Sequence, residues 1–284
     1  MKLSKIFALL LALCLISSAA CAATFTDAHG NVIELDDSLE AYAAVTLVGA
    51  DNAARQGETN LGDLWADALR WFAVSGEINA AFDEDDVKAG NDRIAVDADH
   101  VVALWNGGNL RADIAEGTFG AEALAEVLPF PNKVAVVYMT GAQLLETLEA
   151  ASQGLPYTAE TADACASLMQ VSGLTYTVDT AKAYDALEAY GDHWFTAGSV
   201  SRVRIDDVNG QPFDAEATYA VVTSNANFNG MDSSYVLKAA AEENELSAVT
   251  VAVVRDVVFR FIAAELNHQV GEAYAAPQGR LTVL

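Results

Sequence analysis

Val101-Val102-Ala103-Leu104-Trp105-Asn106-Gly107-Gly108-Asn109-Leu110-Arg111 is the stretch of this sequence that says most about the fold. Five apolar residues open it, which is typical of a short strand buried on both faces of a sheet. A loop with two glycines follows, and glycine reaches backbone conformations that other residues avoid. We therefore expect a core strand that ends at a glycine-containing loop, with Asn106 and Arg111 at the two ends of that loop.

The segments around this stretch predict both strands and helices. Asn60 is expected to cap a helix that runs to about Ala73, because the apolar residues between them recur at helical spacing. Thr140 and Gln143 form a capping-box pattern that opens a second helix. Further strands are expected over 24–50 (with a turn at 29–31), 133–139, 170–178, 201–205 and 219–224, and further helices near Asp232 and over 249–266. Several strands are adjacent, which favours an α/β (α+β) domain with mixed sheets layered with helices.

The first 22 residues are typical of an export signal. Lys2 and Lys5 precede an apolar run over 6–16, and small residues follow as far as Ala23. The run is shorter than the roughly 20 residues that a membrane-spanning helix needs. We expect cleavage before Ala23, which leaves 23–284 as a single periplasmic or secreted domain with no membrane span. The alternative is a lipoprotein modified at Cys21.

The composition excludes several classes of function. With 40 acidic and 15 basic residues, the chain has a formal net charge of −25, which argues against binding nucleic acid through a broad basic face. Any anionic ligand must be met by a few well-placed arginines, because the overall field repels it. The 4 histidines lack metal-ligand spacing, and neither a G-x-S-x-G elbow, a phosphate loop nor a dinucleotide fingerprint occurs.

Four other segments stand out in addition to 101–111. They are Arg55-Gln-Gly-Glu58-Thr59-Asn60-Leu61-Gly62-Asp63-Leu64-Trp65-Ala66-Asp67-Ala68, Val127-Leu128-Pro129-Phe130-Pro131-Asn132, Gln170-Val171-Ser172-Gly173-Leu174-Thr175-Tyr176 and Thr223-Ser-Asn-Ala-Asn-Phe-Asn229-Gly230-Met231-Asp232. In this order and spacing the five segments resemble the C-terminal domain of the 5'-nucleotidase family. The resemblance covers roughly residues 45 to 235, and Gly279-Arg280-Leu281 is similar to the closing motif of that family.

The resemblance implies a specific site. In this family the domain holds the nucleoside, while a separate N-terminal metallophosphatase domain performs the hydrolysis. The substrate-binding positions of the family map onto Arg55, Asn106, Arg111, Phe130, Asn132 and Asp232. The resemblance implies that the arginines meet phosphate, Phe130 stacks on a base and Asp232 accepts from ribose hydroxyls, all of which suit these side chains.

Departures from the family pattern also occur. Ala226 stands where a second stacking phenylalanine is usual, although Phe228 lies two residues further on. Asn109, Pro131 and Met231 replace glycines of the family motifs. The metal-binding motifs of the metallophosphatase domain are not found in this sequence. The expectation is therefore a substrate-binding domain standing alone, with no catalytic residue, metal or cofactor in this chain.

Three functions remain open from the sequence. The leading hypothesis is an extracytoplasmic nucleotide- or nucleoside-binding domain in nucleotide catabolism or salvage, not hydrolytic by itself. The second is the substrate-binding half of a split 5'-nucleotidase, acting with a separate metallophosphatase chain. The third is a degenerate structural or partner-binding domain.

Several of the residues singled out also have structural alternatives. Arg55 and Arg111 could pair with carboxylates, Phe130 could be a core residue, Asn106 a turn residue and Asp232 a helix N-cap. Trp65, Trp105 and Cys165 are expected to be core residues.

Overall fold

The computed structural model describes residues 23–26, 32–35, 40–82, 94–190 and 193–284. The predicted export signal and the predicted turn at 29–31 lie outside the described residues. Within those ranges, every helix is too short or too polar to cross a bilayer.

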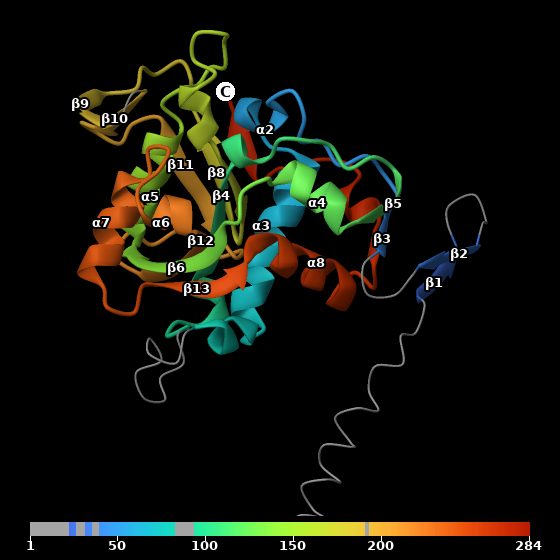
Figure 1. The fold of residues 1–284 in the computed structure, drawn as a ribbon. Helices are drawn as coiled ribbons and strands as arrows, with labels where there is room; N and C mark the ends of the chain where they lie inside the picture. The colour runs from blue at the N-terminus through green and yellow to red at the C-terminus, as the bar shows by residue number, and fades with distance from the viewer. Residues whose placement is uncertain (1–22, 27–31, 36–39, 83–93, 191–192) are drawn as a thin grey trace, which may run out of the picture.

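A mixed five-stranded sheet forms the centre of the fold. Its strand order is β13-β6-β12-β4-β7 (Figure 1), with the bounds Ala248–Val253, Lys133–Thr140, Thr218–Ser224, Val101–Asn106 and Met169–Ser172. β4 and β12 run parallel, with Val101 opposite Ala220, and the other neighbours are antiparallel. The apolar run at 101–105 is thus an inner strand, as the sequence predicts.

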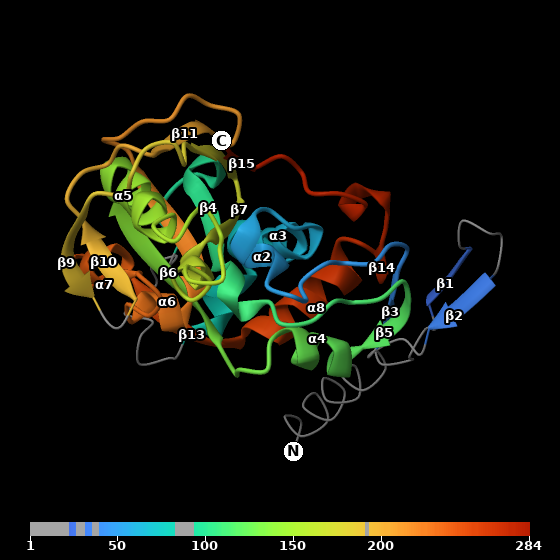
Figure 2. The same cartoon turned by 90° about the horizontal axis from the view of Figure 1, so that it is seen from above.

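Helices cover both faces of this sheet. α3 (Asn60–Val74), α4 (Ala121–Val127) and α8 (Val254–Ala264) pack on one face, and α5 (Gly141–Ala151) and α7 (Tyr235–Glu243) on the other (Figures 1 and 2). Residues of β4 alternate between two cores, because successive side chains of a strand point to opposite faces. Val101, Ala103 and Trp105 enter the core under α3, whereas Val102 and Leu104 enter the core under α5. The predicted layering of helices on mixed sheets is confirmed.

Smaller sheets and short helices complete the fold. Two three-stranded sheets have the orders β14-β3-β5 (Gln269–Val270, Glu40–Ala43, Gly117–Gly120) and β11-β8-β15 (Val203–Val208, Leu174–Val178, Leu281–Val283). Two hairpins are β1-β2 (Ala23–Thr26, Val32–Leu35) and β9-β10 (Ala186–Tyr190, Trp194–Ala197). The short helices are α2 (Ala53–Gln56), α6 (Asn225–Phe228), η1 (Glu77–Ala81), η2 (Ala98–His100), η3 (Gly107–Asn109), η4 (Ala164–Ser167) and η5 (Glu272–Tyr274).

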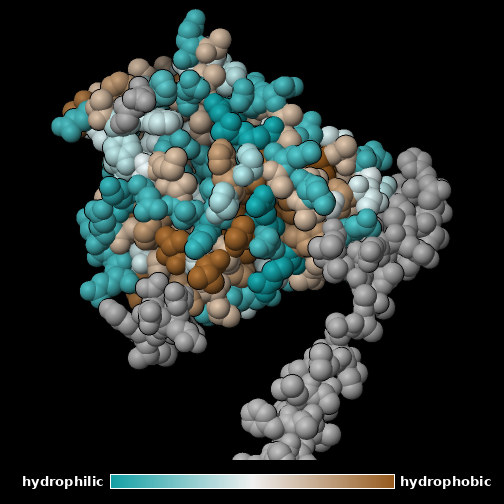
Figure 3. All heavy atoms as spheres, viewed as in Figure 1, coloured by the Kyte–Doolittle hydropathy of each residue, from teal (hydrophilic) through white to brown (hydrophobic). Residues whose placement is uncertain are grey.

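One predicted helix begins later than the sequence indicates, because its first residues form a strand. Residues 249–266 were expected to be helical, but the first part of this segment is β13 and the helix α8 begins only at Val254. The β-branched run of β13 pairs with β6, and packing on a neighbouring strand outweighs the apolar pattern that a helix and a buried strand share. β13 is an edge strand with Val251 exposed. On the face seen in Figure 1, hydrophobic residues gather over β6 and β13 (Figure 3).

Three other boundaries also differ from the prediction. Thr59, not Asn60, caps α3, and its hydroxyl accepts from the Gly62 amide at 3.0 Å. The strand expected over 170–178 is two strands, since Gly173 turns the chain with φ 81°. The helix expected near Asp232 begins at Tyr235.

The capping box at Thr140 is confirmed. The Thr140 hydroxyl accepts from the Gln143 amide at 3.2 Å, and the Gln143 side chain accepts from the Thr140 amide at 2.9 Å. Trp65 and Trp105 are fully buried with ring centroids 6.2 Å apart, and Cys165 is buried as a free thiol.

Candidate functional site

The parallel pairing of β4 and β12 assembles the centre of the site. Asn106 ends β4, and Asp232 follows β12 after the short helix α6. Both therefore lie at the edge of the sheet where the parallel strands β4 and β12 have their carboxyl ends. Asn106 Nδ2 donates to Asp232 Oδ2 at 2.7 Å, and Asn109 Nδ2 donates to Asn106 Oδ1 at 2.8 Å. This chain of hydrogen bonds fixes the orientation of the Asn106 amide and of the Asp232 carboxylate.

Two arginines act on the Asp232 carboxylate. Burial raises the pKa of Asp232, and the positive charges of Arg55 and Arg111 oppose that rise. The pKa of Arg111 is lowered, first by burial and then by the charge of Arg55, while Asp232 opposes the change. The structure therefore brings these three charged groups, far apart in the sequence, into one electrostatic neighbourhood.

Arg111 and Phe130 form a second contact within the site. The Arg111 guanidinium carbon lies 5.8 Å from the Phe130 ring centroid, a distance typical of a cation–π interaction. The residue Phe130 is 44% exposed, so the alternative that made it a core residue is wrong. Within the described residues Arg111 has no carboxylate partner at ion-pair distance, in contrast to Arg55. An accessible aromatic ring next to a guanidinium is thus the most open part of the site.

Arg55 is partly engaged with the protein itself. Its Nη1 donates to the Ala162 carbonyl at 2.9 Å and lies 3.8 Å from Asp163 Oδ1. Asp163 is exposed, with 74% of its side chain accessible, so this pair is held in solvent. The structural alternative of a salt bridge therefore holds for Arg55, although its charge still reaches Asp232.

Asn132 forms no side-chain hydrogen bond or ion pair with the other five predicted residues within the described part of the chain. It is buried just before β6, and its carbonyl accepts from the Val254 amide at 2.9 Å. Among the described contacts, none joins the Asn132 side chain to Asp232 or the arginines. The Asn132 backbone therefore supports the junction between β6 and α8, and the predicted role of Asn132 as a ligand-binding residue stays a prediction.

Two further expectations change with the structure. Asp232 is not a helix N-cap, because Ser234 occupies that position before α7, and Asp232 has a left-handed backbone with φ 50°. Phe228 is half-buried and packs against the core under α5 and α7, which argues against its replacing the stacking ring absent at position 226.

The two glycines of the 106–109 loop have a packing role. A Cβ on Gly107 would lie 1.9 Å from the Ala54 carbonyl oxygen, and one on Gly108 would lie 2.6 Å from the Ala166 Cβ. These glycines let α2 and η4 approach the loop, which brings Arg55 towards Asp232. This packing role adds to the expected close approach of the backbone to a ligand, which stays a prediction.

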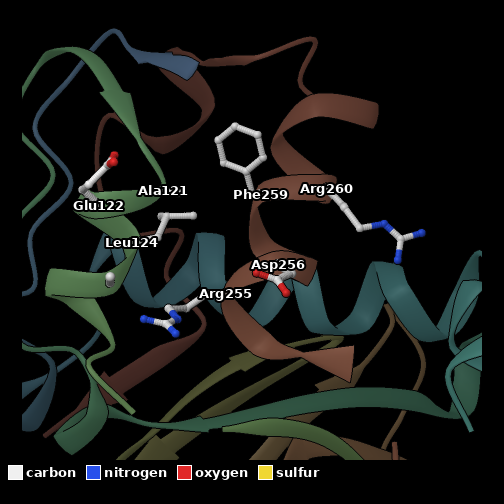
Figure 4. A pocket seen from close by; sticks show the side chains of 8 residues that line it. Ala121, Glu122, Leu124, Arg255, Asp256, Phe259 and Arg260 are labelled. Atoms are coloured by element: carbon white, nitrogen blue, oxygen red, sulfur yellow. The ribbon is translucent and has the colours of Figure 1, made fainter. Parts of the chain in front are cut away.

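A hollow of about 490 Å³ lies elsewhere on the molecule, between α4 and α8 (Figure 4). Leu124, Phe259 and charged side chains line it, and none of the six predicted site residues is among them. Across the described ranges, no group of three or more histidine, cysteine or acidic side chains could hold a metal ion.

Comparisons with known proteins agree with this architecture. Residues 40–239 match the family model described as 5'-nucleotidase, C-terminal domain. The trifunctional nucleotide phosphoesterase protein YfkN of Bacillus subtilis (strain 168) is 29% identical over 212 residues, which are 73% of this chain and 12% of that protein. The chain thus spans a small fraction of the curated relative that it matches.

Solved structures show the same likeness. The 5'-nucleotidase precursor of Thermus thermophilus is 25% identical with a TM-score of 0.62, over 99% of this chain and 43% of that one. The NAD nucleotidase of Haemophilus influenzae shares the fold at 14% identity and a TM-score of 0.57, over 92% of this chain and 48% of that one. On the match to the family model, this chain belongs to the 5'-nucleotidase C-terminal domain family.

Proposed function

We propose that this domain binds a nucleoside or nucleoside monophosphate outside the cytoplasm and serves nucleotide catabolism or salvage without hydrolysing its ligand alone. One observation carries the proposal: Asn106, Arg111, Phe130 and Asp232 meet at one edge of the central sheet, with the charge of Arg55 reaching the same carboxylate. The relatives named as nucleotidases and as a nucleotide phosphoesterase support the ligand class. The export signal expected from the sequence supports the location.

Each group has a role that suits its chemistry. A carboxylate held by Asn106 has lone pairs left to accept from the two ribose hydroxyls. The guanidinium of Arg111 can donate two parallel hydrogen bonds to phosphate oxygens. The Phe130 ring can stack on a base, which contributes about 1–3 kcal/mol. In a chain with a net charge of −25, these local donors must overcome an unfavourable overall field.

Thermal unfolding of residues 23–284 tests the proposal directly. We expect adenosine and AMP to raise the melting temperature without added divalent metal, because a ligand that binds only the folded state stabilises it by about 2.7 kcal/mol at a hundredfold excess over Kd. Inorganic phosphate is the control for nonspecific anion binding. A cooperative melt that no nucleoside or nucleotide shifts would instead favour the degenerate, structural alternative.

Two substitutions separate the phosphate and ribose roles. Arg111→Ala is expected to weaken AMP binding roughly tenfold or more, because a charge-assisted pair is worth about 1.5–3 kcal/mol, and to leave adenosine binding nearly unchanged. Asp232→Ala is expected to weaken the binding of both AMP and adenosine. Arg204→Ala, an exposed arginine paired with Asp206, is the matched control, and calorimetric titration is the measurement. Unchanged affinities in both site variants would remove this assignment.

A second candidate is the substrate-binding half of a two-chain 5'-nucleotidase. It is favoured by the names of the matched relatives, a nucleotide phosphoesterase and a 5'-nucleotidase precursor, which imply hydrolysis as well as binding. The test adds the purified protein to a separately purified metallophosphatase chain and measures phosphate release from AMP. An increase that Asp232→Ala abolishes would support this function, and an unchanged rate would count against it.

A further inference from the structure

The hairpin β9-β10 is an outlying part of the fold that ends at the candidate site. It forms a two-stranded sheet of its own, and β9 is almost entirely exposed. Two strands alone are marginally stable in water, so side-chain contacts must hold the hairpin in place. At its base, Tyr184 donates to the Phe195 carbonyl at 2.7 Å, which joins one side of the hairpin to the other.

The far end of β9 contacts the turn that carries Asp232. The Tyr190 hydroxyl donates to the Gly230 carbonyl at 2.7 Å. A Cβ on Gly230 would lie 2.2 Å from that hydroxyl, so the contact uses the space that glycine leaves free. The centroid of the Tyr190 ring lies 5.7 Å from that of Tyr235 on α7, a second contact that holds the tyrosine in place.

This turn has a backbone that needs support. Asp232 and the next residue, Ser233, have φ values of 50° and 55°, and such left-handed conformations of non-glycine residues cost of order 1 kcal/mol or more each. They persist only where the surroundings hold them. The Met231 amide donates to the Ala226 carbonyl at 3.0 Å, and Asn106 Nδ2 donates to the Asp232 carboxylate at 2.7 Å. The Tyr190 hydroxyl adds an attachment at Gly230 that comes from the hairpin.

His193, the residue just before β10, lies near Asp163, which pairs with Arg55 of the candidate site. His193 Nε2 lies 4.0 Å from Asp163 Oδ2, and the other oxygen of Asp163 lies 3.8 Å from Arg55 Nη1. One end of the hairpin thus contacts the supports of both Arg55 and Asp232. Neither contact was visible in the sequence, because the hairpin lies outside the motifs that carry the resemblance.

We propose that Tyr190 is a positioning residue of the ligand site. Its hydroxyl holds the Gly230–Asp232 turn and thereby aligns the Asp232 carboxylate with the ribose hydroxyls. Tyr190 acts through the turn and not through the ligand. The inference rests on the proposed nucleoside-binding function and adds to it the residue that sets its preference for a complete ribose.

The test compares Tyr190→Phe with Tyr184→Phe, titrating each with adenosine and with 2',3'-dideoxyadenosine. Both variants lose one hydroxyl-to-carbonyl hydrogen bond on the same hairpin, but only Tyr190 contacts the turn. Tyr190→Phe is expected to weaken adenosine binding roughly three- to tenfold, in line with the loss of one neutral hydrogen bond. The affinity of Tyr190→Phe for 2',3'-dideoxyadenosine should stay within about twofold of the wild-type value. Tyr184→Phe should bind both ligands with wild-type affinity.

Amide hydrogen exchange of the ligand-free protein gives an independent measure. Residues 230–234 are expected to exchange faster in Tyr190→Phe than in Tyr184→Phe, because opening of the turn loses one constraint. If the wild type binds adenosine but the two variants behave alike, the inference fails and the proposed function stands. If the wild type binds neither nucleoside, or both equally, the proposed ribose contact fails and the inference with it.

Discussion

Replacing Glu149 by alanine is expected to lower the free energy of unfolding by about 2–5 kcal/mol, because two buried backbone amides lose their acceptor and the buried Arg202 loses a nearby compensating charge. Glu149 is fully buried on α5, and its carboxylate accepts from the amides of Arg202 at 2.9 Å and Val203 at 2.8 Å. The Arg202 side chain is buried as well, and the charge of Glu149 opposes the burial that lowers the Arg202 pKa. Alanine would remove the acceptor of two amides and the compensating charge together.

The arginine makes this loss larger than that of an ordinary helix residue. Arg202 donates to the carbonyls of Ser152 at 3.0 Å and Leu155 at 2.7 Å, so it closes the C-terminal end of α5 while Glu149 holds the start of β11. Glu146→Ala is the matched control, since Glu146 lies one turn earlier on α5, is half-buried and accepts from the Tyr235 hydroxyl. We expect it to cost about 1 kcal/mol in urea unfolding. Equal losses of unfolding free energy in Glu149→Ala and Glu146→Ala would show that Glu149 stabilises the fold no more than an ordinary half-buried glutamate.

The fold was predictable where local pattern and tertiary environment agree. The apolar run at 101–105 is the inner strand β4, and the pattern at Thr140 is a formed capping box. The error at 249–266 arose because an apolar, β-branched segment suits either a helix or a strand until its neighbour is known. β6 offers β13 a free edge, and backbone pairing decided the outcome.

The site was predictable through the family motifs and not through spacing. Nothing local to Asn106 or Asp232 indicates that they share a hydrogen bond, because the parallel pairing of β4 with β12 brings them together. The exposure of Phe130 and the burial of Asn132 depend on how the 128–132 segment turns into β6. Tyr190 carried no signal at all, since its contact is to a backbone carbonyl that any sequence supplies.

A buried carboxyl at the start of α3 makes the stability of the protein depend on pH. Asp63 is fully buried, its Oδ2 accepts from the Gln278 amide at 3.0 Å, and its Oδ1 lies 3.9 Å from Arg280 Nη1 with no hydrogen-bond partner. Burial raises the pKa of Asp63 to about 8, the charge of Arg280 opposes the rise, and the Glu58 carboxylate adds to it. The effect of burial on the pKa of Asp63 exceeds that of the Arg280 charge, because Arg280 is already paired with Asp67. Arg280 Nη1 lies 2.8 Å from Asp67 Oδ1.

The sign of the pH dependence follows from proton binding. In the unfolded chain Asp63 returns to a pKa of 3.8, so between about pH 4 and pH 8 the folded state binds one proton more than the unfolded state. The contribution of Asp63 to stability is therefore fully present below about pH 4, falls as pH rises and is lost above about pH 8. A full proton of difference corresponds to a slope of about 1.4 kcal/mol per pH unit.

Asp63→Asn is expected to remove this slope while keeping the acceptor for the Gln278 amide. The wild type should lose stability relative to the variant by up to about 1.4 kcal/mol for each pH unit from 5 to 8, measured by urea unfolding at each pH. Asp51→Asn, the same change at an exposed position, is the control that corrects for the altered net charge. Parallel curves for wild type and Asp63→Asn would show that Asp63 stays ionised in the folded protein, so that the attraction of Arg280 outweighs burial.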